Sequence, residues 1–340
     1  MPDLRLQSLV VVFLPRRSPH AGTTSLNPVL TERRHDLGSQ SPLDAIGRAA
    51  GLRAWIRAIR PEQWLKNGFV LSPLVFSGKA LMWDAQWRAL VAFGSFCAVA
   101  SAVYLMNDVI DREADRLHPA KARRPIASGL ITPASALVVA SVLGVIGLAA
   151  GAVVGTGVAA VLIAYLVLNV LYGAWLKNVV IVDVFVIAAF FVMRLVAGAL
   201  AVDVSPSIWL FLCGGLLALF LGFAKRRHEL VLLGGSSPTH RAVLASYSTP
   251  FLDQLSVVLL SVTVVSYIMY TLESDTARIV GSEALSYSTA FVLYGVFRYL
   301  FLVHRNEGGN PTETLLTDRA LMAAVVLWAA YCGAIIYLAR

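Results

Sequence analysis

Apolar runs close to the length of a membrane span recur along this chain and constrain its fold more than any other feature. About nine can be counted, at residues 63–82, 87–108, 133–154, 156–175, 181–201, 206–226, 250–272, 284–303 and 318–339. A helix needs roughly 20 mostly apolar residues to cross the hydrocarbon core of a bilayer. Only 14% of the residues are charged, whereas a soluble domain has about 25%. The sequence therefore predicts an all-α, polytopic membrane protein with about nine transmembrane helices.

The first 50 residues differ from the rest, and we expect them to form a disordered cytosolic extension of a transmembrane domain at 51–340. They are rich in Ser, Pro and Thr and contain two Arg-Arg pairs. The apolar piece Leu9–Leu14 is too short for a signal sequence or a span. Gly51–Ile59 resembles a short interfacial helix. The first apolar run is the weakest, because polar residues interrupt it.

The distribution of positive charge predicts the orientation in the membrane. With the N-terminus in the cytosol, the cytosolic segments hold most of the 28 Lys and Arg residues; these segments are 1–66, 109–132, 176–180, 227–249 and 304–317. The opposite side receives only Lys79, Arg88, Arg278 and Arg340. We therefore expect a multi-pass protein of the plasma membrane whose loop at 271–283 is external.

The segment Asn107–Asp115, with the sequence NDVIDREAD, directly follows the second apolar run. If the helix continues, steps of about 100° per residue place Asn107, Asp108, Asp111 and Asp115 within an arc of roughly 100°. Carboxylates on one face repel each other, and ionisable groups near a bilayer are costly. Mg²⁺ relieves both effects, because one or two carboxylates hold it together with substrate phosphates. The motif thus predicts a magnesium-phosphate site at the membrane surface.

A simpler interpretation of this motif stays open. The segment could be a solvated helix end whose acids pair with Arg112 and Arg116.

The cysteines and the net charge narrow the class of partner. Cys97, Cys213 and Cys332 lie singly inside apolar runs, so the sequence indicates neither a disulfide framework nor a zinc site. The net charge is +8, and the basic residues gather beside the predicted spans without aromatic interleaving. Anionic lipid and anionic substrates are therefore better candidates for partners than nucleic acid.

Polar clusters gather on the predicted cytosolic side: Lys66-Asn67, Asn107–Asp115, His118–Gly129, Lys177 with Asp183, Lys225–Glu229 and Pro311–Arg319. Two arginines, Arg194 and Arg298, lie deeper inside apolar runs, where charged residues normally face a bundle interior. This pattern predicts a polar-mouthed cavity between helices. A channel or transporter with ordinary positive-inside loops is the alternative.

The motif Asn-Asp-x-x-Asp-x-x-x-Asp, followed by Arg123–Gly129 with the sequence RRPIASG, resembles the UbiA superfamily of intramembrane prenyltransferases. The resemblance covers about residues 55–340. It implies nine helices around a central cavity and two acidic motifs that bind Mg²⁺ and a diphosphate. The second motif departs from the family pattern Asp-x-x-x-Asp, because Asp183 is present but Ile187 stands at the place of the second aspartate. This departure implies a different arrangement of phosphates and metal.

Further segments resemble one branch of this superfamily, the decaprenyl-phosphate phosphoribosyltransferases. They are Arg60–Asn67, Val182–Ala188, Arg194–Gly198, Lys225–Leu230, and Pro311–Glu313 with Asp318-Arg319. The resemblance implies an enzyme that transfers 5-phosphoribose from phosphoribosyl diphosphate to a polyprenyl phosphate lipid, for cell-wall arabinan synthesis. Since lipid phosphate is already anionic, this reaction needs no strong general base, and the sequence offers no evident Ser/His/Asp arrangement.

Roles for single residues follow from the resemblance and from side-chain chemistry. We expect Asp111 and Asp115 to bind Mg²⁺, with Asn107 and Asp108 beside them. The phosphates of the sugar donor are expected to contact Lys121, Arg123 and Arg124. The opposite wall is expected to consist of Lys66, Asn67, Tyr172, Lys177 and Asp183, and a cap of Glu313, Asp318 and Arg319. Either acceptor-phosphate binding or simple anchoring at the cytosolic surface would explain Lys225, Arg226 and Arg227.

Two other functions remain open at this point. One is a prenyltransferase that alkylates an aromatic acceptor with a prenyl diphosphate, and Ile187 counts against it. The other is a membrane transporter, and the position of the acidic motif at one end of a span, away from the midplane, counts against that. The sequence is compatible with a homo-oligomer.

Overall fold

The computed structural model describes residues 42–119, 121–205, 207–232, 244, 246–273, 283–305, 314 and 317–338, and every regular element among them is a helix. By packing, the chain divides into Met1–Ala45 and Ile46–Arg340, and the site described below lies in the second unit. The elements are α1 (Pro42–Ile59), η1 (Pro61–Leu71, a 3₁₀ helix), α2 (Ser72–Phe76), α3 (Trp83–Ile110), α4 (Arg112–Leu117), α5 (Pro133–Val154), α6 (Thr156–Ala174), η2 (Leu176–Asn178), α7 (Val182–Ala201), α8 (Ile208–Leu232), α9 (Thr249–Glu273), η4 (Glu283–Ser288), α11 (Thr289–His304) and α13 (Arg319–Leu338).

Eight helical stretches of the described chain are long and apolar enough to cross a membrane, which confirms a polytopic protein and comes close to the predicted nine. They are α3, α5, α6, α7, α8, α9, α11 together with η4, and α13. The remaining run, 63–82, forms η1 and the short α2. Lys66 and Asn67 make this segment more polar than the other runs, and Pro73 cannot donate a backbone hydrogen bond, so it does not form one long helix. An 11-residue 3₁₀ helix is unusual, since such helices rarely exceed three or four residues.

The predicted extension at residues 1–50 lies mostly outside the described residues, and α1 already begins at Pro42. Its boundary stays a prediction. The same holds for two other expectations, because residues 274–282 of the external loop and the segment Pro311–Glu313 lie outside the described residues.

Helix α3 has the most buried apolar stretch, whereas α5 and α6 expose theirs. About 61% of the most apolar stretch of α3 is buried, but only 22% of that of α5. On α5, Val138, Val145 and Ile146 keep 64%, 66% and 56% of their surface exposed. Isolated exposed apolar residues are common in any protein, but rows of them along a span indicate contact with lipid. A buried polar site is therefore expected beside α3.

Two glycines allow close approach of the elements around α3 and α7. A Cβ at Gly147 of α5 would lie 2.7 Å from Val99 Cγ2 of α3, and one at Gly198 of α7 would lie 2.0 Å from the Val70 carbonyl oxygen of η1. Small residues at helix contacts are a common means of packing within membranes. Gly198 thus lets η1 rest directly against α7.

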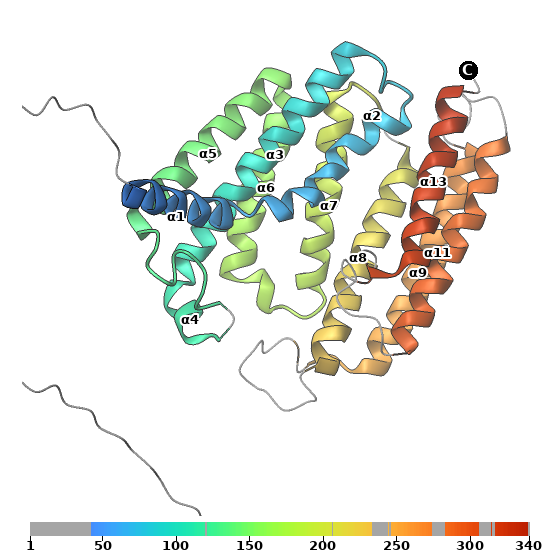
Figure 1. Cartoon of the computed structure of the whole chain (residues 1–340). Coiled ribbons are helices and arrows are strands. Elements are labelled where there is room, and N and C mark those ends of the chain that lie inside the picture. The colour runs from blue at the N-terminus through green and yellow to red at the C-terminus, as the bar shows by residue number, and fades with distance from the viewer. Residues whose placement is uncertain are drawn as a thin grey trace, which may run out of the picture. The chain divides into compact units, whose positions relative to one another are not determined.

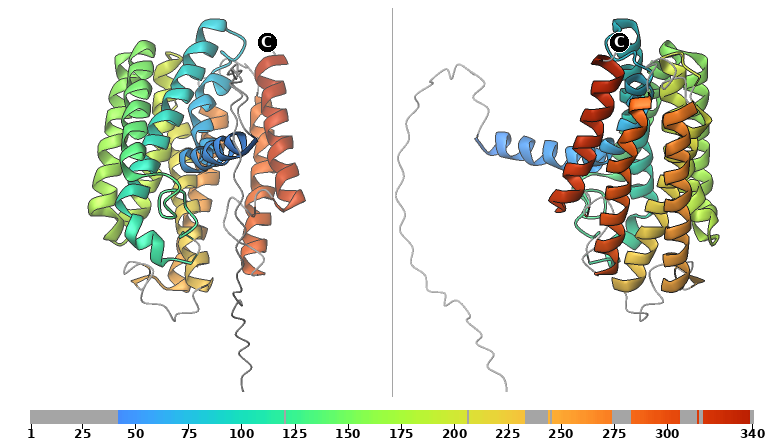
Figure 2. Two further views of the ribbon diagram at one scale, coloured as in Figure 1. Left: turned by 60° about the vertical axis from the view of Figure 1, so that its left-hand side comes forward. Right: turned by 90° about the vertical axis from the view of Figure 1, so that its right-hand side faces the viewer.

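The polar helix ends meet on one side of this unit. Figure 1 shows the end of α3 with α4, the start of α7 and the end of α8 at the lower side of the view, and the turned views in Figure 2 agree. The sequence predicted that these ends face the same side.

Candidate active site

The acidic motif lies at the junction of α3 and α4. Asp111 occupies the junction itself, and backbone hydrogen bonds of 2.8 Å join Asp111 N to Asn107 O and Asp115 N to Asp111 O. The helical path therefore continues almost unbroken. Asp108 and Asp115, seven residues apart, are both buried at 3% exposed, while Asn107 and Asp111 are exposed.

One guanidinium bridges the two buried carboxylates. Arg124 Nη1 lies 2.6 Å from Asp115 Oδ2 and 3.1 Å from Asp108 Oδ1. Arg60 Nη2 donates to the same Asp108 oxygen at 2.5 Å, and Lys121 Nζ lies 3.9 Å from Asp115 Oδ1. Arg60 has a left-handed backbone with φ of 54°, which is uncommon for a residue other than glycine and often accompanies functional sites.

The simpler interpretation of the motif does not describe the structure. Arg112 and Arg116 pair with Glu113, at 3.6 and 3.1 Å, and not with Asp108, Asp111 or Asp115. Glu113 lies on the other side of the helix, as the periodicity predicts. The buried aspartates instead form ion pairs with basic residues of the loop after α4 and with Arg60 before η1.

The donor set fits a hard divalent cation, although the described residues show no group of three acidic, His or Cys side chains close enough to enclose one. Asn107 and Asp111 are exposed, and within the described chain neither side chain has a hydrogen-bond partner. Their oxygens are the kind that Mg²⁺ prefers, and Asp115 lies one turn beyond Asp111. In this structure the cation between Asp108 and Asp115 is the guanidinium of Arg124.

A second polar centre surrounds Asp183 at the start of α7. Asp183 is fully buried; Arg226 Nε donates to its Oδ2 at 3.0 Å and the Tyr247 hydroxyl to its Oδ1 at 3.2 Å. Arg226 also donates to Glu229 Oε2 at 2.9 Å. Both oxygens of Asp183 are therefore already engaged, and its expected contact with the sugar stays a prediction.

Tyr247 also supports the strained entry to α7. The Ile181 backbone N–H donates to its hydroxyl oxygen at 2.6 Å, and Ile181 has φ of 69°, a rare conformation for a β-branched residue. Burial is the main cause that raises the pKa of Tyr247 to about 12. The hydroxyl thus stays protonated at neutral pH and remains able to donate to Asp183.

A third, basic centre lies where η1 packs against α7 and α3. Asn67 is buried; its Oδ1 accepts from Arg194 Nε at 2.8 Å, and its Nδ2 donates to Cys97 Sγ at 3.3 Å. Lys66 retains exposed surface while protein surrounds much of it. Burial, and then the positive charges of Lys225, Arg194 and Arg60, lower the pKa of Lys66 to about 8.

The remaining predicted site residues differ in how far they are buried and in what they contact. Tyr172 is half-buried, packs edge-on to Phe190 at 6.1 Å between ring centroids, and interacts electrostatically with Arg226. Lys177 is half-buried in η2, and Arg123 and Lys225 are exposed.

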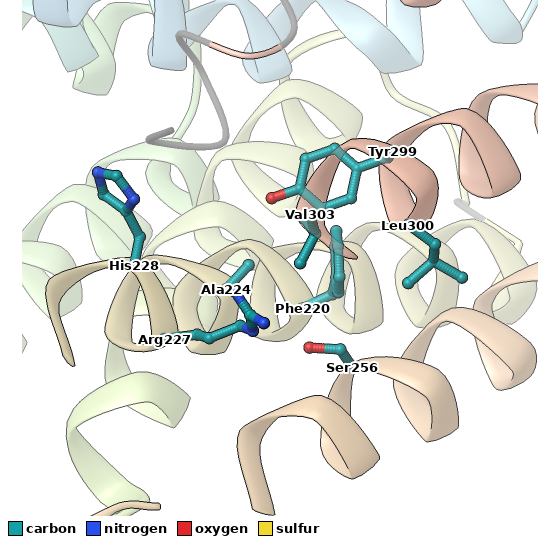
Figure 3. Close-up of a pocket in the computed structure, with 8 residues that line it drawn as sticks. All are labelled: Phe220, Ala224, Arg227, His228, Ser256, Tyr299, Leu300 and Val303. Carbon is teal, nitrogen blue, oxygen red and sulfur yellow. The ribbon is translucent and has the colours of Figure 1, made fainter. Parts of the chain in front are cut away.

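Arg227 belongs to a different neighbourhood from Arg226. It forms an ion pair with Asp253 of α9 and lines a small pocket between α8, α9 and α11. Figure 3 shows that Arg227 and His228 project from α8 in different directions around this pocket. No residue of the acidic motif and no part of the Asp183 centre lines it. Arg227 is therefore paired with a neighbouring helix, and its expected role in acceptor binding or in anchoring at the cytosolic surface stays a prediction.

Arg298 and Asp318 also pair away from these centres. Their two bonds measure 3.2 and 2.7 Å, and Asp318 Oδ1 accepts the Leu321 N–H at 2.7 Å, which caps α13. The bonds from Arg298 are the main cause that lowers the pKa of Asp318.

Sequence reasoning assigned no role to Arg60, Glu229, Tyr247 and Arg194. Arg60 is the first residue of the segment Arg60–Asn67, which the resemblance already singles out. Arg194 lies deep inside an apolar run, and this position alone indicates that it faces the interior of the bundle. Glu229 lay within the cluster Lys225–Glu229. Tyr247 carries no local signal, because its partner Asp183 lies 64 residues away in the chain.

Residues 70–315 match the UbiA prenyltransferase family. The chain is 32% identical over 292 residues to decaprenyl-phosphate phosphoribosyltransferase of Mycolicibacterium smegmatis, covering 83% of this chain and 92% of the relative. It is 30% identical over 277 residues to the protein of that name in Corynebacterium glutamicum, covering 80% and 83%. A solved UbiA homolog from Archaeoglobus fulgidus bound to GPP and Mg²⁺ has a TM-score of 0.61 at 18% identity, covering 83% of this chain and 99% of that chain; this likeness concerns the fold.

Proposed function

This chain belongs to the UbiA prenyltransferase family, and from that premise we propose that it transfers 5-phosphoribose from phosphoribosyl diphosphate to a polyprenyl phosphate and releases diphosphate. The observation that carries the proposal is that both carboxylate oxygens of Asp183, in the second centre, already accept hydrogen bonds from the protein. Asp183 is engaged by Arg226 and Tyr247, and Ile187 supplies no second carboxylate. One acidic centre, at the end of α3, is thus left for a metal-bound diphosphate. The mycobacterial and corynebacterial relatives support this branch and a role in cell-wall precursor synthesis.

The acidic centre would hold the leaving group. Asn107, Asp108, Asp111 and Asp115 are the residues that would bind Mg²⁺, which when bound neutralises charge on the diphosphate. Arg124 and Lys121 already face these carboxylates, and with the exposed Arg123 they would reach the phosphate oxygens.

The reaction needs alignment and charge stabilisation more than acid-base chemistry. The bond between the ribose carbon and the diphosphate oxygen breaks as an oxygen of the lipid phosphate bonds to that carbon from the opposite face. No net proton moves, and the configuration at the carbon inverts. The protein's task is to hold two anionic substrates against each other, which accounts for the cations on η1, α7 and α8.

We place this chemistry on the cytosolic face of the plasma membrane. The support is the charge distribution along the sequence and the gathering of the polar helix ends on one side. Phosphoribosyl diphosphate is a water-soluble metabolite, so a donor site open to the cytosol suits it.

The test is a transfer assay with purified protein, labelled phosphoribosyl diphosphate, decaprenyl phosphate and Mg²⁺. We expect a labelled lipid that forms only when both substrates are present. A parallel reaction offers a prenyl diphosphate and an aromatic acceptor. If the protein consumes that pair and ignores phosphoribosyl diphosphate, the branch assignment is wrong and only family membership stands.

A further inference from the structure

A buried arginine without a carboxylate partner lies beside the proposed substrate site. Arg194 is 4% exposed, and a guanidinium keeps its charge in proteins. It donates to three neutral oxygens: Asn67 Oδ1 at 2.8 Å, the Phe190 carbonyl at 2.5 Å and the Tyr165 hydroxyl at 3.4 Å. Within the described chain no Asp or Glu forms an ion pair with it.

Five other arginines of the described chain that are at least partly buried each pair with a carboxylate: Arg60 with Asp108, Arg124 with Asp115, Arg226 with Asp183, Arg227 with Asp253 and Arg298 with Asp318. Within the same part of the chain Arg123 has no such pair, but it is exposed to solvent. A buried charge is costly unless it is paired, so the exception calls for an anion from outside the chain.

Lys66 adds a second cation to the same place. It precedes Asn67 in η1, and its Nζ donates to the neutral Gln63 Oε1 at 2.7 Å. No carboxylate of the described chain pairs with it either. The charges of Arg194, Lys225 and Arg60 all act on Lys66. Several like charges are thus gathered where η1 meets α7, although their mutual repulsion is unfavourable.

The surroundings hold Arg194 in one orientation. The rings of Phe96, Tyr165 and Phe191 lie 5.7, 5.2 and 5.6 Å from its guanidinium carbon. Gly198, one turn further along α7, lets η1 approach closely, which fixes Asn67 against Arg194. A guanidinium has five N–H donors, and three are used here, so two are left for a ligand.

The geometry points to a binding site for a phosphate monoester, formed by Arg194 and Lys66. A guanidinium can bind two phosphate oxygens through parallel N–H groups, and an ammonium adds a point charge. The assignment rests on the proposed function, because both substrates of that reaction carry such a group: the lipid phosphate and the 5-phosphate of the donor. Arg194 lies about 18 Å along α7 from Val182, at about 1.5 Å per residue, and this depth favours the lipid.

Two isosteric substitutions test the site without changing its shape. Asn67→Asp places a carboxylate on Arg194, and Gln63→Glu places one on Lys66. Gln86→Glu adds the same charge near the start of α3, at the other end of that helix from the acidic motif, and serves as the control. Binding of a short-chain polyprenyl phosphate in detergent micelles and of phosphoribosyl diphosphate with Mg²⁺ is measured separately, together with the melting temperature.

We expect Asn67→Asp and Gln63→Glu to weaken lipid phosphate binding at least tenfold, with the fold intact and the Gln86→Glu control unchanged. Weakening of phosphoribosyl diphosphate binding instead supports the site and assigns it to the 5-phosphate. Wild-type affinity for both ligands in the folded variants overturns the proposal. Failure of the unmodified protein to transfer phosphoribose overturns the proposed function, whereas lipid phosphate binding by that protein and its variants still decides this site.

Discussion

Arg226 and Asp183 form the most deeply buried ion pair of the described chain, with 3.0 Å between Nε and Oδ2 and side chains only 3% and 0% exposed. The pair joins α8 to the first turn of α7. It gives the remaining aspartate of the second acidic motif a structural partner, whatever contact it also makes with substrate.

Asp183→Ala should therefore destabilise the protein by about 3–5 kcal/mol, because the substitution leaves Arg226 buried and uncompensated. The double variant Asp183→Ala/Arg226→Met should recover much of this loss. Thermal unfolding in detergent measures both. A single variant that melts like the unmodified protein, and only has a higher KM for phosphoribosyl diphosphate, would instead show that the sugar contact dominates.

Asp111→Asn should leave the melting temperature nearly unchanged and lower turnover by about 10²-fold or more, because Asp111 is exposed and has no side-chain partner. Asp115→Asn should lower turnover too, and should also cost about 1–3 kcal/mol of stability, since it weakens the bond from Arg124. Transfer rates and unfolding curves separate the two effects. Normal turnover by Asp111→Asn at ordinary Mg²⁺ concentration would remove Asp111 from the metal site.

Arg124→Gln should raise the affinity of the free protein for a divalent cation about tenfold, because Arg124 competes for Asp108 and Asp115. The same substitution should weaken binding of phosphoribosyl diphosphate, which loses a cationic contact. Mn²⁺ binding, followed by electron paramagnetic resonance without substrate, measures the first effect directly. Arg123→Gln, at an exposed neighbour, is the matched control. Unchanged Mn²⁺ affinity in Arg124→Gln would contradict the competition.

Lys66 should make substrate affinity depend on pH in the mildly alkaline range. Its pKa is about 8, so it is charged below this pH and neutral above it. The KM for the phosphate that it contacts should rise as the pH increases from about 7 to about 9. Lys66→Arg stays charged throughout and should lack this rise. The two profiles are compared in one assay, which cancels titration of the substrates; identical profiles would exclude Lys66 as the titrating group.

Cysteine labelling should place the two ends of the helices on opposite sides of the membrane. In a background without Cys97, Cys213 and Cys332, Ser128→Cys should react only from the cytosol and Tyr287→Cys only from outside. Both positions are exposed. Reaction of Ser128→Cys with an impermeant reagent in intact cells would reverse the orientation.

The helices of this protein were largely predictable because length and apolar composition decide them. The third predicted run, 133–154, coincides with α5, where Thr132 caps the helix and Pro133 opens it. The run 63–82 does not form one long helix, and hydropathy does not reveal that η1 rests on α7 through Gly198. The depth of packing between distant segments is not encoded in any local pattern.

The candidate site was predictable only where its residues are close in sequence. The acidic motif and the loop that carries Arg124 lie within 16 residues of each other, so their meeting could be expected. Arg60 reaches Asp108 across 48 residues, and Tyr247 reaches Ile181 across 66, and neither contact has a periodic signature. The electrostatic effect of Lys225 on Lys66 likewise joins residues that lie far apart in the sequence.

The support that α7 gives to η1 sets an order of events during biosynthesis. Asn67 leaves the ribosome 127 residues before Arg194, its hydrogen-bond partner. The segment 61–76 is divided between two short helices, η1 and α2, and is not among the helices long and apolar enough to cross a bilayer alone. The hydrogen bond that holds Asn67 against α7 can therefore form only after more than half of the 340 residues have been made.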